Sequence, residues 1–251
     1  NYPGQGSIRE RKANFEQCFK ALHKKLGPKQ YMLIEYKPFE PAFYQTDVAD
    51  WGMAYVYSKK AGPRSKILVD IGHHYNATNV EQIVAWLLDE DMFGGLHLND
   101  RRYADDDLTL GSIDPYQIFR VFHEIHFFAS DRGKMPKIPY MVDQCHNEKP
   151  KVEAMLQTVA MAQDLYAKAA IVDHDALRRA QAKNNVIDAE LILKKAFFTD
   201  VSPAIAAFRK QNKLPGDPLA EHRRQGYEKK AAADRNRRRK DMGITRGGSF
   251  A

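Results

Sequence analysis

Four short apolar runs in this chain each end in a side chain that can bind a metal ion. The runs span residues 31–35, 66–70, 94–97 and 139–143. Carboxylates gathered without a counter-charge raise one another's pKa, and a bound cation relieves that repulsion. Oxygen ligands with one imidazole favour Mn²⁺, Mg²⁺ or Co²⁺, with Zn²⁺ as a further option. The four terminal residues are Glu35, Asp70, His97 and Asp143.

The lengths and boundaries of these runs are typical of buried parallel strands, and helical patterns lie between several of them. In a parallel α/β barrel, the carboxyl ends of the strands meet at one rim, where the chemistry takes place. Taken singly, each of the four residues would as readily cap a helix, pair with an arginine or form a hydrogen-bonded core histidine. Taken as a set, they predict one metal site at the rim.

A second set of ligand types lies in the adjoining loops. His73 follows Asp70 by three residues, and Asp105 and Asp107 flank Asp106 in an acidic triplet. In an extended loop, residues two apart point the same way, so Asp105 and Asp107 would face one ion while Asp106 points elsewhere. The alternative is a solvated acidic loop. Beside a first metal site, the pattern predicts a second ion.

Helical patterns precede the first run and separate later ones. Apolar residues keep helical spacing from Phe15 up to a stop at Gly27. Asn79 and Gln82 have the form of a capping box ahead of an apolar stripe, and Asp114–Pro115 supplies an N-cap and a first-turn proline ahead of another. We expect these helices to pack on the sheet.

The sequence predicts an α/β fold with four parallel strands, whereas a closed (β/α)8 TIM barrel has eight. We therefore expect residues 1–150 to form the second half of such a barrel, with the first half outside this sequence or supplied by a partner. Alanine-rich helical periods then follow over 151–183, 188–200 and 202–213. The prediction is a helical extension over 151–213 and a basic tail over 214–251.

The net charge of +7 belongs almost entirely to the tail. From residue 221 to 251, ten Lys or Arg stand against four Asp or Glu, which leaves +1 for the other 220 residues. A solvated, partly helical extension explains this better than nucleic-acid binding does. No signal peptide or membrane-spanning run is evident, and Cys18 and Cys145 lie too far apart in the sequence to suggest a disulfide framework. We expect a cytoplasmic protein without a membrane partner.

Four motifs resemble the L-rhamnose isomerase family, of the bacterial type with broad aldose and ketose specificity. They are residues 35–44 (EYKPFEPAFY), 69–74 (VDIGHH), 97–107 (HLNDRRYADDD) and 142–147 (VDQCHN), and the resemblance extends from Phe15 to about Asn212. It implies a barrel of the xylose isomerase type, usually a homotetramer, that interconverts an aldose and its ketose. It also implies two divalent ions, with Mn²⁺ expected.

The resemblance also implies roles for individual residues. The ion that binds substrate would be held by Glu35, Asp70, His97 and Asp143, and Glu35 would bridge to a catalytic ion held by His73, Asp105 and Asp107. Lys37 resembles the lysine that contacts the sugar oxygen near carbon 1, although a salt bridge within the acidic cluster is the alternative. Asp143 would assist ring opening through a water molecule. The implied catalytic residues are Lys37, Asp143 and His73.

The expected reaction is conversion of L-rhamnose to L-rhamnulose. Hydrogen would move from carbon 2 to carbon 1, and the resemblance favours a hydride over a proton relayed by a carboxylate. The alternatives are a sugar epimerase, another enzyme of this barrel superfamily, or an inactive chain that binds nucleic acid through its tail. Four aromatic residues would line the pocket, form a subunit contact or, as aromatics more often do, belong to the core: Phe39, Phe43, Tyr44 and Trp51. Cys145 stands where relatives would carry a small polar residue.

Overall fold

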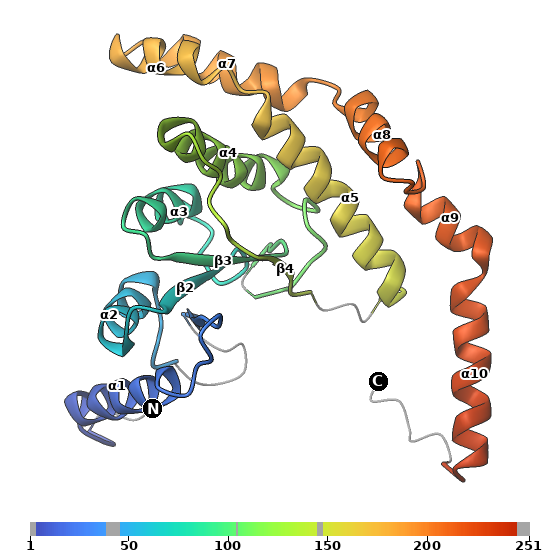
Figure 1. The fold of residues 1–251 in the computed structure, drawn as a ribbon, viewed down its shortest axis with the longest axis horizontal. Coiled ribbons are helices and arrows are strands. Elements are labelled where there is room, and N and C mark those ends of the chain that lie inside the picture. The colour runs from blue at the N-terminus through green and yellow to red at the C-terminus, as the bar shows by residue number, and fades with distance from the viewer. Residues whose placement is uncertain (1–3, 39–45, 104, 145–147, 245–251) are drawn as a thin grey trace.

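The computed structural model describes residues 4–38, 46–103, 105–144 and 148–244. Four strands form one parallel sheet in the order β1-β2-β3-β4. They are β1 (Met32–Glu35), β2 (Ser65–Asp70), β3 (Phe93–Leu98) and β4 (Tyr140–Val142). Each strand lies on one of the four apolar runs, so the predicted strands and their parallel arrangement are confirmed (Figure 1).

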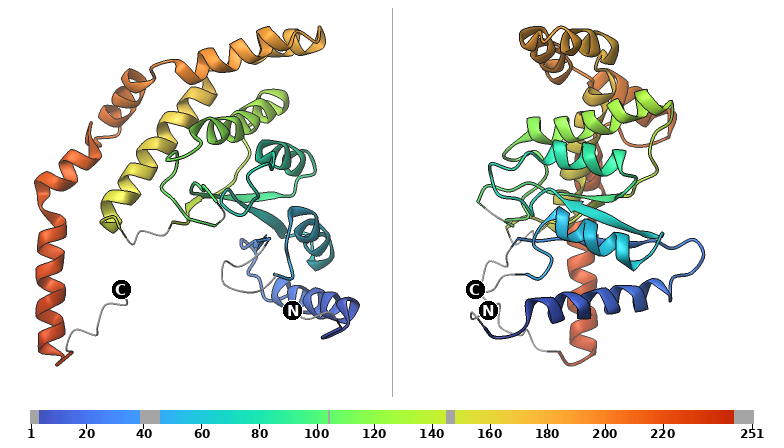
Figure 2. Two further views of the ribbon diagram at one scale, coloured as in Figure 1. Left: turned by 180° about the vertical axis from the view of Figure 1, so that it is seen from behind. Right: turned by 90° about the vertical axis from the view of Figure 1, so that its left-hand side faces the viewer.

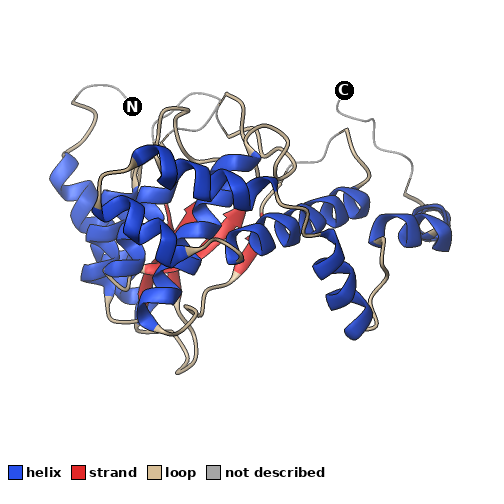
Figure 3. Ribbon diagram, turned by 90° about the horizontal axis from the view of Figure 1, so that it is seen from above, coloured by secondary structure: helices blue, strands red, loops and turns tan. Residues whose placement is uncertain are grey.

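Helices cover one face of this sheet. They are α1 (Ile8–His23), α2 (Trp51–Ala61), α3 (Val80–Asp89) and α4 (Pro115–Arg132). The side chain of Asn79 accepts a hydrogen bond from the backbone N–H of Gln82, and Asp114 does the same for Gln117. Both predicted N-caps are therefore confirmed. Viewed from above, the strands lie inside a layer of these helices (Figure 3).

The structure corrects two expectations about local elements. Helix α1 ends at His23, before the predicted stop at Gly27. Helix α2 was not predicted, because its glycine and its aromatic and β-branched residues obscure the apolar stripe; Asp50 caps it. Trp51 packs against the core, as the core alternative expects, and meets Trp86 of α3 edge-on at 5.7 Å. The remaining aromatic candidates and the unusual cysteine lie outside the described residues: Phe39, Phe43, Tyr44 and Cys145.

Because side chains alternate along a strand, one face of the sheet carries core residues and the other carries the ligand candidates. Ile67, Val69 and Leu96 are fully buried and belong to the core shared with the helices. Leu68 and Asp70 alternate with them and point to the other face. A Cβ on Gly95 would lie 3.2–3.3 Å from side-chain atoms on that face, which belong to Leu33, Leu68 and Pro139. The ligand candidates therefore stand opposite the helices, on the inner face of the sheet.

The strands are staggered along the sheet. Glu35 pairs with Leu68, and Asp70 lies two residues further along β2. Asp70 pairs with His97, which in turn pairs with Met141, two residues before Asp143. Such a stagger accompanies the strand tilt of a barrel. Among the described residues, the sheet remains open at β1 and β4, so closure into a barrel is not established.

The C-terminal part is helical throughout its described length. It comprises α5 (Lys151–Ala170), α6 (His174–Ala182), α7 (Val186–Phe198), α8 (Ser202–Gln211), α9 (Pro218–Gln225) and α10 (Tyr227–Asp241). Helix α5 packs on α4, and the later helices run along the outside of the molecule (Figures 1 and 2). The helical period expected over 151–183 breaks at 171–173, where Asp173 caps α6. Within the described residues, no helix has the length and apolar character needed to cross a membrane.

Candidate metal centre

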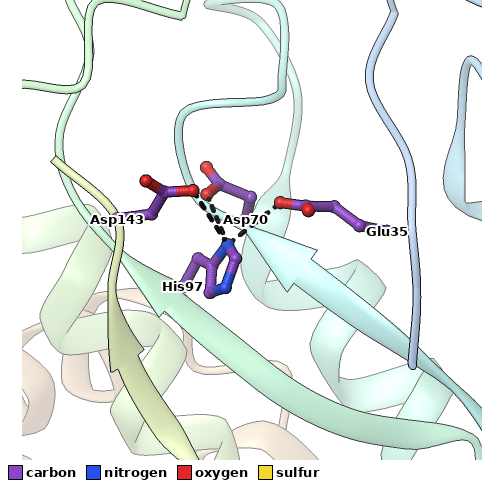
Figure 4. Close-up of side chains that lie close together, drawn as sticks. All are labelled: Glu35, Asp70, His97 and Asp143. Carbon is purple, nitrogen blue, oxygen red and sulfur yellow. Dashed lines mark hydrogen bonds and ion pairs between the residues drawn. The ribbon is translucent and has the colours of Figure 1, made fainter. Parts of the chain in front are cut away.

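The four strand-end residues converge at the carboxyl edge of the sheet. Glu35 ends β1, Asp70 ends β2, His97 lies one residue before the end of β3, and Asp143 follows β4. Each offers a ligand atom that lies within 4.8 Å of the others. The longer side chain of Glu35 helps it to reach past the two-residue stagger with Asp70. Figure 4 shows the three carboxylates directed at one nitrogen of the imidazole ring of His97.

All three carboxylates approach the same nitrogen atom. His97 Nδ1 lies 2.9 Å from Glu35 Oε1, 3.1 Å from Asp70 Oδ2 and 3.4 Å from Asp143 Oδ2. One N–H group cannot form good hydrogen bonds to three carboxylates at once. A divalent cation, by contrast, takes several carboxylate oxygens and an imidazole nitrogen together. The geometry and chemistry of this donor set therefore fit a metal ion.

Asp70 is the most firmly held member of the set. Its side chain is fully buried, and its Oδ1 accepts hydrogen bonds from the backbone N–H of Gly72 (2.7 Å) and from Asn99 Nδ2 (2.9 Å). A Cβ on Gly72 would lie 3.1–3.3 Å from Asn99 and Asp70, so the close approach favours glycine. These bonds leave Oδ2 directed at His97.

The charges of this cluster shift the pKa values of its members. Hydrogen bonds to Asp70 and Glu35 raise the pKa of His97 to about 10. Burial acts to raise the pKa of Asp70, but the hydrogen bond with His97 and the charge of His73 outweigh it and hold that pKa below its ordinary value. The protonated imidazole thus supplies the positive charge that the buried carboxylate needs, a task that a bound cation would take over.

The acidic loop after β3 brings the second set to the same edge. An isolated bridge between Asp100 and Leu108 closes this loop. Asp105 and Asp107 line a cavity there, whereas Asp106 accepts hydrogen bonds from the backbone N–H groups of residues 102 and 103. Asp105 and Asp107 thus face one cavity as predicted, but the loop is not extended. Asp107 adopts the left-handed conformation, with φ 47°.

The second set also contains a buried carboxylate oxygen that has no hydrogen-bond donor among the described residues. Burial, followed by the charges of Asp105 and Asp70, raises the pKa of Asp107 to about 7. Asp105 Oδ1 is buried without a hydrogen-bond partner among the described residues, and His73 Nε2 lies 3.1 Å from it. A buried carboxylate oxygen without a donor is costly. A cation between this oxygen and the imidazole would remove that cost.

Glu35 and Lys37 connect the two sets. Glu35 Oε1, which lies 2.9 Å from His97 Nδ1, is also 3.6 Å from Nδ1 of His73. The Lys37 ammonium group forms an ion pair with Asp105. The salt bridge considered as an alternative role for Lys37 is thus present, and Lys37 still lines the cavity.

The cavity at the ligand residues has a volume of about 400 Å³, within the range of small-molecule sites. Its lining includes Glu35, Lys37, His73, Asp107 and Asp143. A larger hollow of about 830 Å³ lies at the opposite, amino ends of the strands, between residues that include Leu33, Lys66, Gly94 and Pro139. That hollow contains none of the clustered ligand candidates, so its size does not make it the site of chemistry.

Sequence reasoning missed the residues that support the ligands. Asn99 is fully buried, and its Nδ2 lies 2.9 Å from Asp70 Oδ1 and 3.4 Å from Asp107 Oδ1. Buried Arg101 donates to the backbone carbonyl groups of Ile71 and Tyr75 and so holds the loop that carries His73. Asn99 and Arg101 are within the motif at 97–107, but nothing in the sequence distinguished them from solvated loop residues.

Comparison with known proteins adds two relatives. The chain is 39% identical over 235 residues to a probable sugar isomerase of Rhizobium meliloti, and 38% identical over 235 residues to a probable sugar isomerase of Mesorhizobium japonicum. Both matches cover 94% of this chain but only 55% of the relative, so the chain spans about half the length of these proteins. No protein-family model matches the chain.

Proposed function

We propose that this chain carries the metal centre of an aldose–ketose isomerase, whose most favoured reaction is the conversion of L-rhamnose to L-rhamnulose. The observation that carries the proposal is the convergence of Glu35, Asp70, His97 and Asp143 at the carboxyl edge of a parallel sheet. The similarity to two probable sugar isomerases supports it. A sugar isomerase also accounts for the small, polar cavity beside the cluster.

The proposed centre holds two divalent ions, with Mn²⁺ favoured over Co²⁺, Zn²⁺ and Mg²⁺. The first would be held by the strand-end cluster, and the second by His73, Asp105 and Asp107. Glu35 would serve both, since its Oε1 lies 2.9 Å from His97 Nδ1 and its side chain lines the same cavity as His73, Asp105 and Asp107. The buried, unpartnered oxygen of Asp105 supports a cation at the second position.

The chain's own groups would bind the sugar and handle its protons. When bound, the ions would polarise the carbonyl group and hold neighbouring sugar oxygens. Lys37 would give up its ion pair with Asp105 and donate a hydrogen bond to a sugar oxygen instead. Asp143, whose side chain is 55% exposed, faces the cavity and would accept a proton during ring opening. His73 would hold the second ion in the same cavity as Lys37 and Asp143.

The whole enzyme requires more than this chain describes. We propose that the four strands form the second half of a (β/α)8 barrel, with the remaining strands in the part of the relatives that this chain does not span. Those strands would complete the sugar pocket and cover the hollow at the amino ends. A homotetramer is the proposed assembly.

The function is tested by metal analysis together with sugar conversion. The complete protein, including the part of the relatives' length that this chain does not span, should contain up to two Mn²⁺ per chain and convert L-rhamnose to its ketose. Asp70→Asn should lose both the first ion and at least about 99% of turnover, because it removes a buried charged ligand. Asp91→Asn is the matched control, since Asp91 is exposed and pairs with Lys66 at the other end of the sheet.

Thermal unfolding provides an independent measurement of ion binding. At an ion concentration 100 times the dissociation constant, Mn²⁺ should stabilise the wild-type protein by about 2.7 kcal/mol. Asp70→Asn should abolish most of that gain, and Asp91→Asn should keep it. Unchanged ion content and turnover in Asp70→Asn would refute the assignment. A product epimeric with the substrate, instead of a ketose, would favour the epimerase alternative.

A further inference from the structure

We propose that Tyr36 is a positioning residue that sets the orientation of His73 through hydrogen bonds to two consecutive histidines. The inference rests on the proposed two-ion centre and deepens it, because it explains how one ligand of the second ion is fixed. Tyr36 lies between Glu35 and Lys37 at the end of β1, so its side chain points away from theirs. It is 2% exposed.

Tyr36 contacts the two histidines with different groups. Its backbone carbonyl accepts a hydrogen bond from His73 Nδ1 at 2.9 Å. Its hydroxyl group lies 2.6 Å from His74 Nε2, and the two rings meet edge-on at 5.4 Å. The adjacent histidines therefore have opposite roles. His73 lines the cavity, whereas His74 is buried against Tyr36.

His74 is in turn hydrogen-bonded to the backbone of the loop that carries it. His74 Nδ1 lies 3.2 Å from the carbonyl oxygen of Ile71 and donates to it. Arg101 also donates to that oxygen, at 2.7 Å, and to the carbonyl oxygen of Tyr75. The segment from residue 71 to residue 75 is thus tied both to Tyr36 and to Arg101. Displacement of the loop would break several buried hydrogen bonds together.

These contacts determine which nitrogen of His73 is available to bind a metal ion. Because Nδ1 donates to the Tyr36 carbonyl group, Nε2 is the nitrogen left to bind an ion, and it lies 3.1 Å from Asp105 Oδ1. Hydrogen bonds of this kind fix the ring orientation of a metal-binding histidine. The Tyr36 carbonyl group belongs to the same peptide as the Lys37 N–H, which donates to the Val48 carbonyl oxygen at 2.9 Å. The buried hydroxyl bond to His74 adds a second restraint on this peptide, through the Tyr36 side chain.

The test is Mn²⁺ binding to Tyr36→Phe, measured by calorimetry and by electron paramagnetic resonance. This substitution keeps the ring and the carbonyl group and removes only the hydroxyl group. We expect the affinity for the second ion to fall about 10- to 100-fold, while the affinity for the first changes less than about twofold. Asp107→Asn, which removes a ligand of the second ion, identifies the binding step that belongs to it.

A second variant and a control make the result specific. His74→Leu should weaken the second ion as Tyr36→Phe does, and the double variant should be little worse, because both substitutions break the same bond. Tyr57→Phe, at another buried tyrosine on α2, should leave both affinities unchanged. Thermal unfolding monitored by circular dichroism verifies that each variant is folded.

Three results would overturn the inference. Wild-type affinity for both ions in Tyr36→Phe would show that the hydroxyl group does not position His73. An equal loss at both ions, accompanied by lower thermal stability, would assign Tyr36 a general structural role. A wild-type protein that binds the first ion but no second one would remove the two-ion centre itself. The first two results leave the proposed function intact, and the third does not.

Discussion

The Lys37 ammonium group and the Asp105 carboxylate form an ion pair inside the candidate site. Both side chains are largely shielded from solvent, with exposures of 21% and 11%. One oxygen of Asp105 has no hydrogen-bond partner among the described residues and faces His73. Asp105 is therefore shared between a fixed cation, Lys37, and the position proposed for the second ion. The two positive charges compete for one carboxylate.

Lys37→Met should separate ion binding from turnover. Removal of the ammonium charge should tighten Mn²⁺ binding at the second position by roughly tenfold, which corresponds to about 1.4 kcal/mol, because like charges near a protein surface repel by about this much or more. Sugar turnover should nevertheless fall about 100-fold or more, since a donor to the sugar is lost. Calorimetry and a ketose assay measure the two effects.

Lys60→Met is the matched control for this substitution, because Lys60 pairs with Glu16 on the exterior. It should change neither quantity. Weaker Mn²⁺ binding in Lys37→Met would contradict the competition for Asp105, and unaltered turnover would contradict a role for Lys37 at the sugar.

Asn99→Ala should weaken both ions. The Asn99 amide lies 2.9 Å from Asp70 Oδ1 and 3.4 Å from Asp107 Oδ1, so it spans a ligand of each proposed ion. Loss of such supporting hydrogen bonds costs about 10- to 100-fold in metal affinity. Calorimetric titration with Mn²⁺ should show a lower affinity at both binding steps. Asn76→Ala, which removes an exposed amide bonded to the Arg102 carbonyl group, is the control. A loss confined to one ion would show that Asn99 supports a single site.

Acidification should destabilise the packing of α4 on α5 and α6. Burial lowers the pKa of His123 and that of His126 to about 4, below the ordinary value of 6.5. Between pH 6.5 and 4, the unfolded chain therefore binds protons that the folded protein does not. Stability is present above pH 6.5 and falls with decreasing pH by about 1.4 kcal/mol per pH unit for each such group. Glu124, whose pKa burial raises to about 7, acts in the opposite sense above pH 4.5.

The contribution of His123 can be isolated by substitution. His123 stacks on Phe127, and its Nδ1 has no hydrogen-bond partner among the described residues, so phenylalanine should fit its place. Urea unfolding of His123→Phe at pH 7 and pH 5 should show a smaller loss of stability than the wild-type protein does. An identical loss in both proteins would contradict a buried, neutral His123.

Removal of residues 227–251 should leave sugar turnover within about twofold of the intact protein. Helix α10 packs chiefly against α9 and buries none of its residues. Replacement of Arg237, Arg238 and Arg239 by glutamine tests the charge of this segment without shortening the chain. A large loss of turnover in either variant would show that the tail serves the site. Salt-sensitive binding of DNA that disappears with the tail would instead favour the nucleic-acid alternative.

The sequence alone determined the strands, the two N-caps and the identity of the clustered ligands. These features are local: an apolar run, a cap residue or an alternating triplet carries its signal within a few residues. The convergence of Glu35, Asp70, His97 and Asp143 could be predicted because parallel strands place their carboxyl ends at one edge. Asp105 and Asp107 face one cavity as predicted, but the left-handed backbone at Asp107 shows that an extended loop is not the cause.

Only the tertiary structure decided how these ligands are held. The stagger of two residues between Glu35 and Asp70, and the contacts that Tyr36 makes with His73 and His74, depend on strand register and on loops that meet from distant parts of the chain. The same is true of Asn99, whose amide has two carboxylate neighbours only after β2 and the acidic loop have packed together. A sequence pattern gives the type and spacing of residues, whereas hydrogen bonds between loops require distances that folding alone sets.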